Sequence, residues 1–376
     1  MNQRISLESI EIKGFKSFNS YGQMLELGDL TVLIGANGAG KSNFISFLRM
    51  VSFMMEGSLQ KYIGINGGAN SLLHFGAKYT KQIECQIKFR VNESKDLYRF
   101  VLTHAAGDLL IFTGEELMWH RDGFEKPKLI TMDPGRKESE LLDKSNHAKE
   151  EVKIFLRLLR SLKVYQFHDT TNESPLRAKA YLEDNKYLRS DGGNLAAVLY
   201  ALKNSERWHN SYKRIVEYIR YALPEFEDFV LEPDIYSGNT VILNWKEERS
   251  DHLFGPHQLS DGSLRFMALM GLLLRPKELL PPIIIIDEPE LGLHPSAISV
   301  LASVINLVKS DTQIIIATQS TNLVDEFDAE EIVVVDKDKT DNGSNLKRLN
   351  PKALNEWLEE YSISELWEKN VLGGKP

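Results

Sequence analysis

The feature that most constrains the fold is a glycine-rich loop at residues 35–43, which reads GANGAGKSN. The apolar run 30–34 precedes the loop and the apolar run 44–48 comes after it, so G-x-x-x-x-G-K-[ST] lies between a predicted strand and a predicted helix. The glycines allow backbone N–H groups to turn toward a phosphate chain, and the positive end of the helix dipole attracts the same anion. A glycine-rich turn without a ligand is the alternative, but the complete pattern in this context favours a nucleoside triphosphate site.

The side chains of the loop suit a triphosphate bound with Mg²⁺. Lys41 offers a positive charge for the β- and γ-phosphates, and Ser42 offers an oxygen ligand for the metal. We therefore expect the nucleotide to contact this set of loop residues: Asn37, Gly38, Ala39, Gly40, Lys41, Ser42 and Asn43.

The composition is that of a globular protein with an ample core, with 42% hydrophobic and 26% charged residues in 376. No apolar run approaches the roughly 20 residues of a membrane span, and the N-terminus lacks the layout of a signal peptide. A single cysteine, Cys85, excludes an internal disulfide framework and is expected in the core, so we expect a cytoplasmic protein without a membrane partner. The net charge of −8 argues against a surface devoted to nucleic acid, although a local basic groove stays open.

Hydrophobic periodicity predicts most of the remaining elements. Residues 80–132 alternate with period two and are expected to form an antiparallel meander, whereas 57–76 is loop-rich. A further predicted strand begins at residue 5. The others cover 24–27, 31–34, 165–170, 229–231, 240–245, 283–286, 313–318 and 332–335. The predicted helices cover 43–56, 149–164, 195–203, 208–222, 264–274 and 295–308, and residues 351–376 are expected to be helical.

A basic row marks the polar side of the predicted helix 149–164. It consists of Lys153, Arg157, Arg160 and Lys163. The row could contact DNA, but a solvated helix face is the favoured interpretation, because charged helix faces are normally just that.

A second candidate anion site lies at the start of the apolar helix 264–274. Ser260, Gly262 and Ser263 combine hydroxyls, free backbone N–H groups and a helix dipole. Serine and glycine are ordinary residues at helix starts, so this pattern gains weight only from the acidic motif next along the chain.

Four consecutive isoleucines at 283–286 predict a strand that is buried on both faces and ends in Asp287 and Glu288. Open α/β sheets bind ligands at this carboxyl edge. We expect Asp287 to hold Mg²⁺ directly or through water, and Glu288 to polarise the water that attacks the γ-phosphate. The alternative is that the two acids cap the next helix. Gln319 and Ser320 come directly after the strand 313–318 and are also expected to reach the γ-phosphate.

Together these motifs resemble those of an ABC-type ATPase of the RecF and SMC-like branch, in particular the compact prokaryotic AAA-family ATPases of RecF type. GANGAGKSN resembles the Walker A motif, LSDGSLR at 259–265 the signature motif, and IIIIDEPE at 283–290 the Walker B motif. LGLHP at 291–295 occupies the D-loop position. The segment IEIKGFKSF at 10–18 resembles the opening strand beside the adenine and ribose, which implies that Lys13 and Phe15 contact the nucleotide.

The resemblance implies an α/β fold: a P-loop NTPase of ABC type with a mixed central sheet flanked by helices, plus an inserted α+β subdomain. The spacing between Lys41 and Asp287 is too short for the long arms of SMC proteins. We expect four segments: an ATPase lobe at 1–90, the insertion at 91–256, a second ATPase lobe at 257–350 and a helical segment at 351–376.

The resemblance also implies a mechanism with ATP and Mg²⁺ as ligands. Two copies of the chain would meet head to tail, and Ser260 and Gly262 of one copy would bind the γ-phosphate held by Lys41 of the other. ATP would close this dimer and hydrolysis would open it. Gln319 stands where the family often has a histidine, and a neutral amide carries no proton or charge, so we expect slow hydrolysis. No residue is an unambiguous Q-loop glutamine; Gln60 and His74 are candidates.

Three biological roles remain open. The first is the regulatory ATPase of an anti-phage defence system with an effector such as a nuclease or toxin, and the second is a DNA-binding clamp of RecF type. The third is an ATP-binding scaffold with little turnover. Among weaker candidates, His168 and Asp169 could form a polar pair near the nucleotide, but a structural hydrogen bond is favoured. His252 and His257 lack the spacing of metal ligands.

Overall fold

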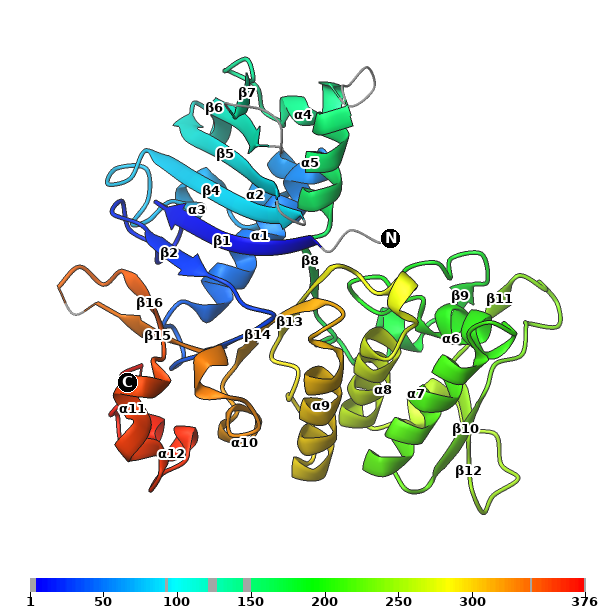
Figure 1. Cartoon of the computed structure of the whole chain (residues 1–376). Helices are drawn as coiled ribbons and strands as arrows, with labels where there is room; N and C mark the ends of the chain where they lie inside the picture. Colours follow the sequence, from blue (N-terminus) through cyan, green and yellow to red (C-terminus); the bar gives the residue numbers. More distant parts are fainter. Residues whose placement is uncertain (1–4, 92–93, 121–126, 145–149, 339, 375–376) are drawn as a thin grey trace. The chain divides into compact units, whose positions relative to one another are not determined.

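The computed structural model describes residues 5–91, 94–120, 127–144, 150–338 and 340–374 (Figure 1). The chain forms two compact units from non-contiguous segments. Unit 1 contains residues 1–164, 282–285 and 328–376, and unit 2 contains residues 165–281 and 286–327. The four-segment division stays a prediction.

An antiparallel sheet dominates unit 1. Its strand order is β2 (Gln23–Glu26), β1 (Ile5–Lys13), β4 (Gln82–Val91), β5 (Ser94–Ala105), β6 (Leu109–His120) and β7 (Lys128–Thr131). The predicted meander is therefore correct, and β4 extends it to the first strand by pairing antiparallel with β1. One face is apolar and carries the buried Cys85, as expected. This face packs on α1 (Lys41–Met55), where the ring of Phe47 stacks on Phe100 of β5 with centroids 6.3 Å apart.

A second group of strands in unit 1 holds the glycine-rich loop. The fully buried strand β3 (Leu30–Ile34) pairs parallel with β15 (Ile332–Lys337), and β15 pairs antiparallel with β16 (Ser344–Arg348). The sheet thus combines parallel and antiparallel pairs, which agrees with the predicted fold class. The C-terminal segment contains two short helices, α11 (Pro351–Leu358) and α12 (Ile363–Glu368), rather than continuous helix.

Two predictions for unit 1 were wrong. Residues 57–76 are not mainly loop, because α2 (Leu59–Ile65) and α3 (Ala69–Leu72) lie there. The carboxylate of Glu138, distant in sequence, accepts hydrogen bonds from the first two backbone N–H groups of α2 at 2.9 and 3.0 Å. The helix predicted to reach residue 164 also ends early: α4 (Glu140–Lys144) and α5 (Glu150–Arg160) are followed by β8 (Lys163–Tyr165). The Ser161 hydroxyl ends α5 by donating to the Leu158 carbonyl at 2.5 Å.

Unit 2 is built around helices α6 (Leu195–Lys203), α7 (His209–Ala222), α8 (Asp261–Leu273) and α9 (Pro295–Val308). Helices α7, α8 and α9 pack side by side (Figure 1). The predicted bounds of α6, α7 and α9 are close to those observed, whereas α8 begins three residues earlier than expected. Strand β14 (Gln313–Thr318) and the end of β13 (Ile283–Asp287) match the predicted strands, and α10 (Thr321–Val324) comes after β14.

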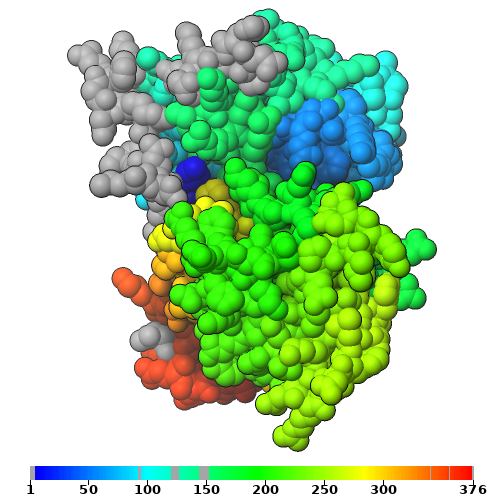
Figure 2. Space-filling view, turned by 90° about the vertical axis from the view of Figure 1, so that its right-hand side faces the viewer, coloured from blue at the N-terminus to red at the C-terminus, as the bar shows by residue number. Residues whose placement is uncertain are grey.

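Short strands complete unit 2. The predicted strand 229–231 is β10 (Phe226–Val230), which pairs with β12 (Asn244–Glu247). The predicted strand 240–245 is broken, because β11 (Thr240–Val241) pairs instead with β9 (Ala180–Tyr181). The loop between β10 and β11 lies at the surface, in the yellow-green region of Figure 2. Short 3-10 turns occur at η2 (Pro175–Arg177), η3 (Pro256–Gln258), η4 (Lys277–Leu279) and, in unit 1, η5 (Ala329–Glu331). Within the described ranges, no helix is both long and apolar enough to cross a bilayer.

Candidate nucleotide site

The glycine-rich loop connects β3 to α1 and is shaped by close contacts with other backbone segments of unit 1. A Cβ atom on Gly35 would lie 2.2 Å from the carbonyl oxygen of Val335, so the loop passes β15 at a distance that only glycine permits. Gly40 has φ 128, and a Cβ there would lie 2.0 Å from the hydroxyl of Ser344. Both glycines are thus required by the fold of the loop, in agreement with the sequence pattern.

Lys41 and Ser42 begin α1 and have opposite environments. Lys41 is buried, and its ammonium group donates hydrogen bonds to the carbonyls of Gly35 and, at 3.2 Å, Ala36. The charge therefore lies in the concavity of the loop. The Ser42 side chain is exposed at the N-terminus of the helix, where an anion and its metal ion would be bound.

A chain of hydroxyl groups fixes the far side of the loop. Asn43 Nδ2 donates to Ser17 Oγ at 2.7 Å, and Ser17 Oγ lies 2.6 Å from Ser344 Oγ. Ser344 Oγ also lies 2.5 Å from the carbonyl oxygen of Ala39. Because each hydroxyl has one proton, every group is satisfied if Ser17 donates to Ser344 and Ser344 donates to Ala39.

The C-terminal segment also contacts the loop. The backbone N–H of Ala36 donates to the carbonyl of Gly374 at 2.8 Å. Gly374 has φ 77, and a Cβ there would lie 2.7 Å from a methyl carbon of Val334. The segment after α12 thus packs on β15 and supports the start of the loop.

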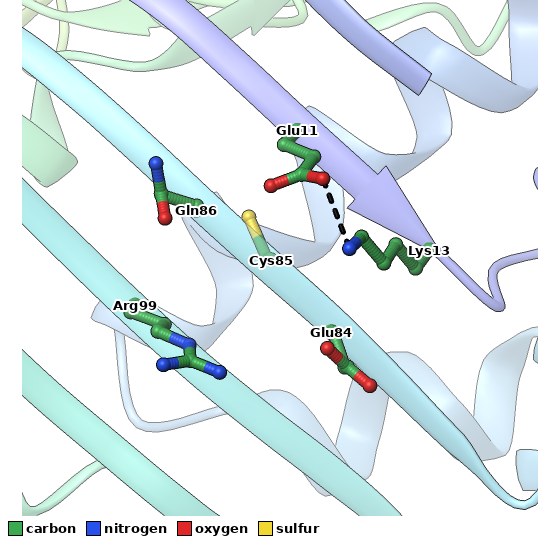
Figure 3. Close-up of a pocket in the computed structure, with 6 residues that line it drawn as sticks. All are labelled: Glu11, Lys13, Glu84, Cys85, Gln86 and Arg99. Carbon is green, nitrogen blue, oxygen red and sulfur yellow. Dashed lines mark ion pairs between the residues drawn. The ribbon is translucent and has the colours of Figure 1, made fainter. Parts of the chain in front are cut away.

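The two residues expected beside the adenine differ in position. Phe15 is fully buried and its ring packs edge-on against Phe47 at 5.1 Å, so its side chain belongs to the core and not to a ligand site. Lys13 forms an ion pair with Glu11 at 3.0 Å (Figure 3). It lines a cavity of about 270 Å³ on strands β1, β4 and β5 together with Glu11, Glu84, Cys85, Gln86 and Arg99. Its contact with the nucleotide stays a prediction.

The Asp287 carboxylate is held by a residue that the sequence analysis missed. Asp287 is buried at the end of β13, and Gln166 Nε2 donates to its Oδ2 at 2.7 Å. His168 Nε2 donates to the Asp287 carbonyl at 2.9 Å, so this histidine makes a structural hydrogen bond, as the sequence favours. An amide within the otherwise apolar sequence Val-Tyr-Gln-Phe was the available signal for Gln166. The roles of the two Q-loop candidates stay predictions. In unit 1, Gln60 Nε2 donates to two carbonyls, and His74 Nδ1 lies 2.6 Å from the Lys16 carbonyl.

Glu288 adopts a left-handed backbone conformation with φ 45. Its N–H donates to the Ala317 carbonyl at 2.8 Å, and Gln319 Nε2 donates to its Oε1 at 2.7 Å. The structure thus brings together two residues predicted from separate strands. The alternative that Asp287 and Glu288 cap the next helix is wrong, because His294 accepts the hydrogen bond at the start of α9.

The signature segment forms the start of α8 in unit 2. Ser260 is the exposed N-cap residue, and its hydroxyl accepts from the Ser263 N–H at 3.1 Å. Gly262 lies against the D-loop, since a Cβ there would be 2.2 Å from the Gly292 carbonyl oxygen. The buried Arg177, which the sequence did not single out, pairs with Asp261 at 3.0 Å and fixes this turn.

Ser42 and Asp287 supply a hydroxyl and a carboxylate oxygen, which are the ligands that Mg²⁺ prefers. Across the described ranges, no group of three or more His, Cys, Asp or Glu side chains could hold a metal ion. Each of these oxygen donors by itself suits Mg²⁺, a metal that is usually held largely by substrate phosphates and water.

The phosphate loop, the carboxylates after a buried strand and the fold define a P-loop ATPase of the ABC, RecF and SMC-like class. The chain belongs to the family described as "AAA domain, putative AbiEii toxin, Type IV TA system", whose model matches residues 30–325. This class agrees with the resemblance drawn from the motifs.

Solved structures support the fold. The chain is similar to an SmcHead bound to the C-winged helix domain of ScpA, with 18% identity, a TM-score of 0.60, and coverage of 92% of this chain and 99% of that chain. It is also similar to the Smc head domain with an extended coiled coil bound to the C-terminal domain of ScpA from Pyrococcus furiosus, with 16% identity, a TM-score of 0.59, and coverage of 95% and 99%. The chromosome partition protein Smc of Clostridium kluyveri (strain NBRC 12016) is 36% identical over 93 residues. That match covers 24% of this chain and only 8% of the length of the Clostridium protein.

Proposed function

We propose that this protein binds and hydrolyses ATP, and that Glu288 polarises the attacking water. The observation that carries the proposal is the geometry of Glu288: a non-glycine residue at φ 45 whose side chain is oriented by Gln319. Backbone conformations of this kind cost of order 1–3 kcal/mol and cluster at functional sites. A carboxylate held in this way directly after a metal-binding candidate suits a general base.

The remaining groups divide the work of binding. The loop amides and Lys41 would bind the β- and γ-phosphates, while Ser42 and Asp287 would hold Mg²⁺. When bound, Mg²⁺ neutralises charge on the transferred phosphoryl group. The neutral amide of Gln319 would donate a hydrogen bond without supplying a proton or a charge, which supports slow turnover.

We further propose that ATP joins two copies head to tail. The exposed Ser260 hydroxyl at the N-terminus of α8, together with Gly262 and Ser263, supports this role, because helix N-termini bind anions. In such a dimer these groups would bind the γ-phosphate held by Lys41 of the second copy. ATP would then act as a switch through its preference for the closed dimer.

For the biological output, we propose a regulatory ATPase of a bacterial defence system that controls a separate effector such as a toxin or nuclease. The family description, which names a putative toxin of a toxin–antitoxin system, supports this role. The single cysteine, Cys85, is free and buried, which supports a cytoplasmic location.

The test is the Glu288→Gln variant, which keeps the shape of the side chain but removes the base. ATP turnover should fall by about 10²- to 10⁴-fold, the usual contribution of general-base catalysis. ATP binding should persist, and size-exclusion chromatography with light scattering should show a dimer in the presence of ATP. Glu326→Gln is the matched control, because Glu326 is exposed and its carboxylate accepts a serine hydrogen bond at 2.7 Å. Equal turnover in Glu288→Gln and the wild type would refute the assignment.

A further inference from the structure

A third carboxylate lies beside Glu288 and Gln319 without a role in the proposed reaction. Glu290 Oε1 accepts hydrogen bonds from the Thr318 hydroxyl at 2.7 Å and from the Gln319 N–H at 3.1 Å. Its other oxygen, Oε2, is buried and has no hydrogen-bond partner among the residues that the structure describes. A carboxylate with one orphaned oxygen costs free energy in this environment, whereas an apolar residue of similar size would not.

The contacts of Glu290 converge on Gln319. The Thr318 hydroxyl that donates to Glu290 also accepts from the Ser320 N–H at 2.9 Å, so both neighbours of Gln319 are fixed by one group. The Gln319 N–H itself is bound by Glu290, and the amide at the end of its side chain donates to Glu288 at 2.7 Å. Gln319 is therefore held by one glutamate at its backbone and by another at its side chain.

We propose that Glu290 is a positioning residue for ATP hydrolysis: it fixes the backbone of Gln319 so that the Gln319 amide orients Glu288. This inference rests on the proposed role of Glu288 as the base. Glu290 does not touch the reacting atoms, and its effect is transmitted through Gln319. Burial raises the pKa of the Glu290 carboxyl, and the charge of Glu288 adds to this rise. A carboxyl group that is buried in this way suits a fixed internal support rather than a group that exchanges protons with solvent.

A purely structural tie between the ends of β13 and β14 is the competing explanation. The two explanations differ in how mutations combine. If Glu290 acts through Gln319, removing both groups should cost no more than removing Gln319 alone, whereas independent effects multiply.

The experiment measures ATP turnover in Glu290→Leu, Glu290→Gln, Gln319→Ala and the Glu290→Leu/Gln319→Ala double variant. Glu290→Leu should lower turnover by about 10- to 100-fold, the range expected for a misplaced catalytic group. Glu290→Gln keeps an acceptor oxygen for Thr318 and Gln319, so its turnover should stay within about threefold of the wild type. The double variant should match Gln319→Ala. Glu326→Leu serves as the control for the loss of a glutamate from unit 2.

Thermal unfolding identifies any variant that fails to fold. If Glu290→Leu is unfolded, Thr318→Val replaces it, because it removes the hydroxyl donor to Glu290 at almost constant volume. The inference is overturned if turnover is unchanged in the folded variant. It is also overturned if the fold-loss of turnover in the double variant equals the product of the fold-losses in the two single variants. Absence of turnover in the wild type, or full activity in Glu288→Gln, would instead refute the proposed function itself, so the two failures are distinguishable.

Discussion

Ser344 provides a sharp test of how the phosphate loop is held in place. Its side chain is 2% exposed, and its hydroxyl is the hydrogen-bond partner of the Ala39 carbonyl at 2.5 Å. Ser344→Ala would leave this carbonyl without that donor at a residue that is only 5% exposed. An unpaired buried acceptor costs about 1–3 kcal/mol, so the free energy of unfolding of unit 1 should fall by this amount in urea titrations.

The same substitution should weaken nucleotide binding, because Ala39 belongs to the loop that we propose turns its N–H groups toward the phosphates. A loss of about 1 kcal/mol in the bound loop corresponds to roughly a fivefold rise in Kd, measurable with a fluorescent ATP analogue. Ser17→Ala removes the preceding hydroxyl, and water can replace it at the half-buried Asn43 amide. It should cost only about 0.5–1.5 kcal/mol.

The exposed Ser20 supplies the control for Ser344→Ala, since Ser20→Ala should change stability by less than about 0.5 kcal/mol. Hydrogen exchange of the amides in residues 36–43 would locate the effect. The ordering of the hydroxyl chain would be refuted if Ser344→Ala cost less than Ser17→Ala, or no more than Ser20→Ala.

Two further changes test other parts of the molecule. Gly262→Ala would place a methyl group 2.2 Å from the Gly292 carbonyl oxygen and should destabilise the fold by about 1–3 kcal/mol. Gly64→Ala in α2 is the contrasting case, because among the described residues its methyl group would meet no atom within 4 Å beyond its chain neighbours and the backbone of its own helix. Thermal unfolding decides this, and equal midpoints for the wild type and Gly262→Ala would contradict it. Burial raises the pKa of Glu115 above its ordinary 4.5, so the folded state binds the proton more tightly. The contribution of Glu115 to the free energy of unfolding is therefore highest below pH 4.5. It decreases as the pH rises from there through the raised pKa. Urea titrations across pH should show this decline in the wild type relative to Glu115→Gln, and parallel curves would exclude it.

Local patterns predicted the elements around the site well. The run at 30–34 is the buried strand β3, and the glycine-rich loop after it leads into α1. The isoleucine run is β13, with Asp287 and Glu288 at its end. These predictions succeed because burial on both faces, or phosphate-loop geometry, leaves few residue choices along the local sequence.

Predictions failed where distant residues decide the structure. The N-terminus of helix α2 is capped by the carboxylate of Glu138, which lies 79 positions along the chain from Leu59, the residue that donates to it. Gln166 reaches Asp287 from 121 positions away, so its role is visible only in three dimensions. Phe15 lies in a motif that resembles a nucleotide contact, yet its ring fills the core against Phe47. Motif resemblance identified the segment but not the direction of this side chain.

The contacts of the phosphate loop have a consequence for its synthesis. Ser344, which binds the Ala39 carbonyl, lies 305 positions further along the chain, and Gly374, which binds the Ala36 N–H, lies further still. On the ribosome, β3 and α1 emerge before these partners, so the loop between them lacks both contacts until the segment through residue 374 has emerged. Contacts of such sequence separation form late, since the loop-closure entropy is lost only once both partner segments are available. A nascent chain that stops before residue 374 therefore contains the whole loop sequence without all the contacts that support the loop.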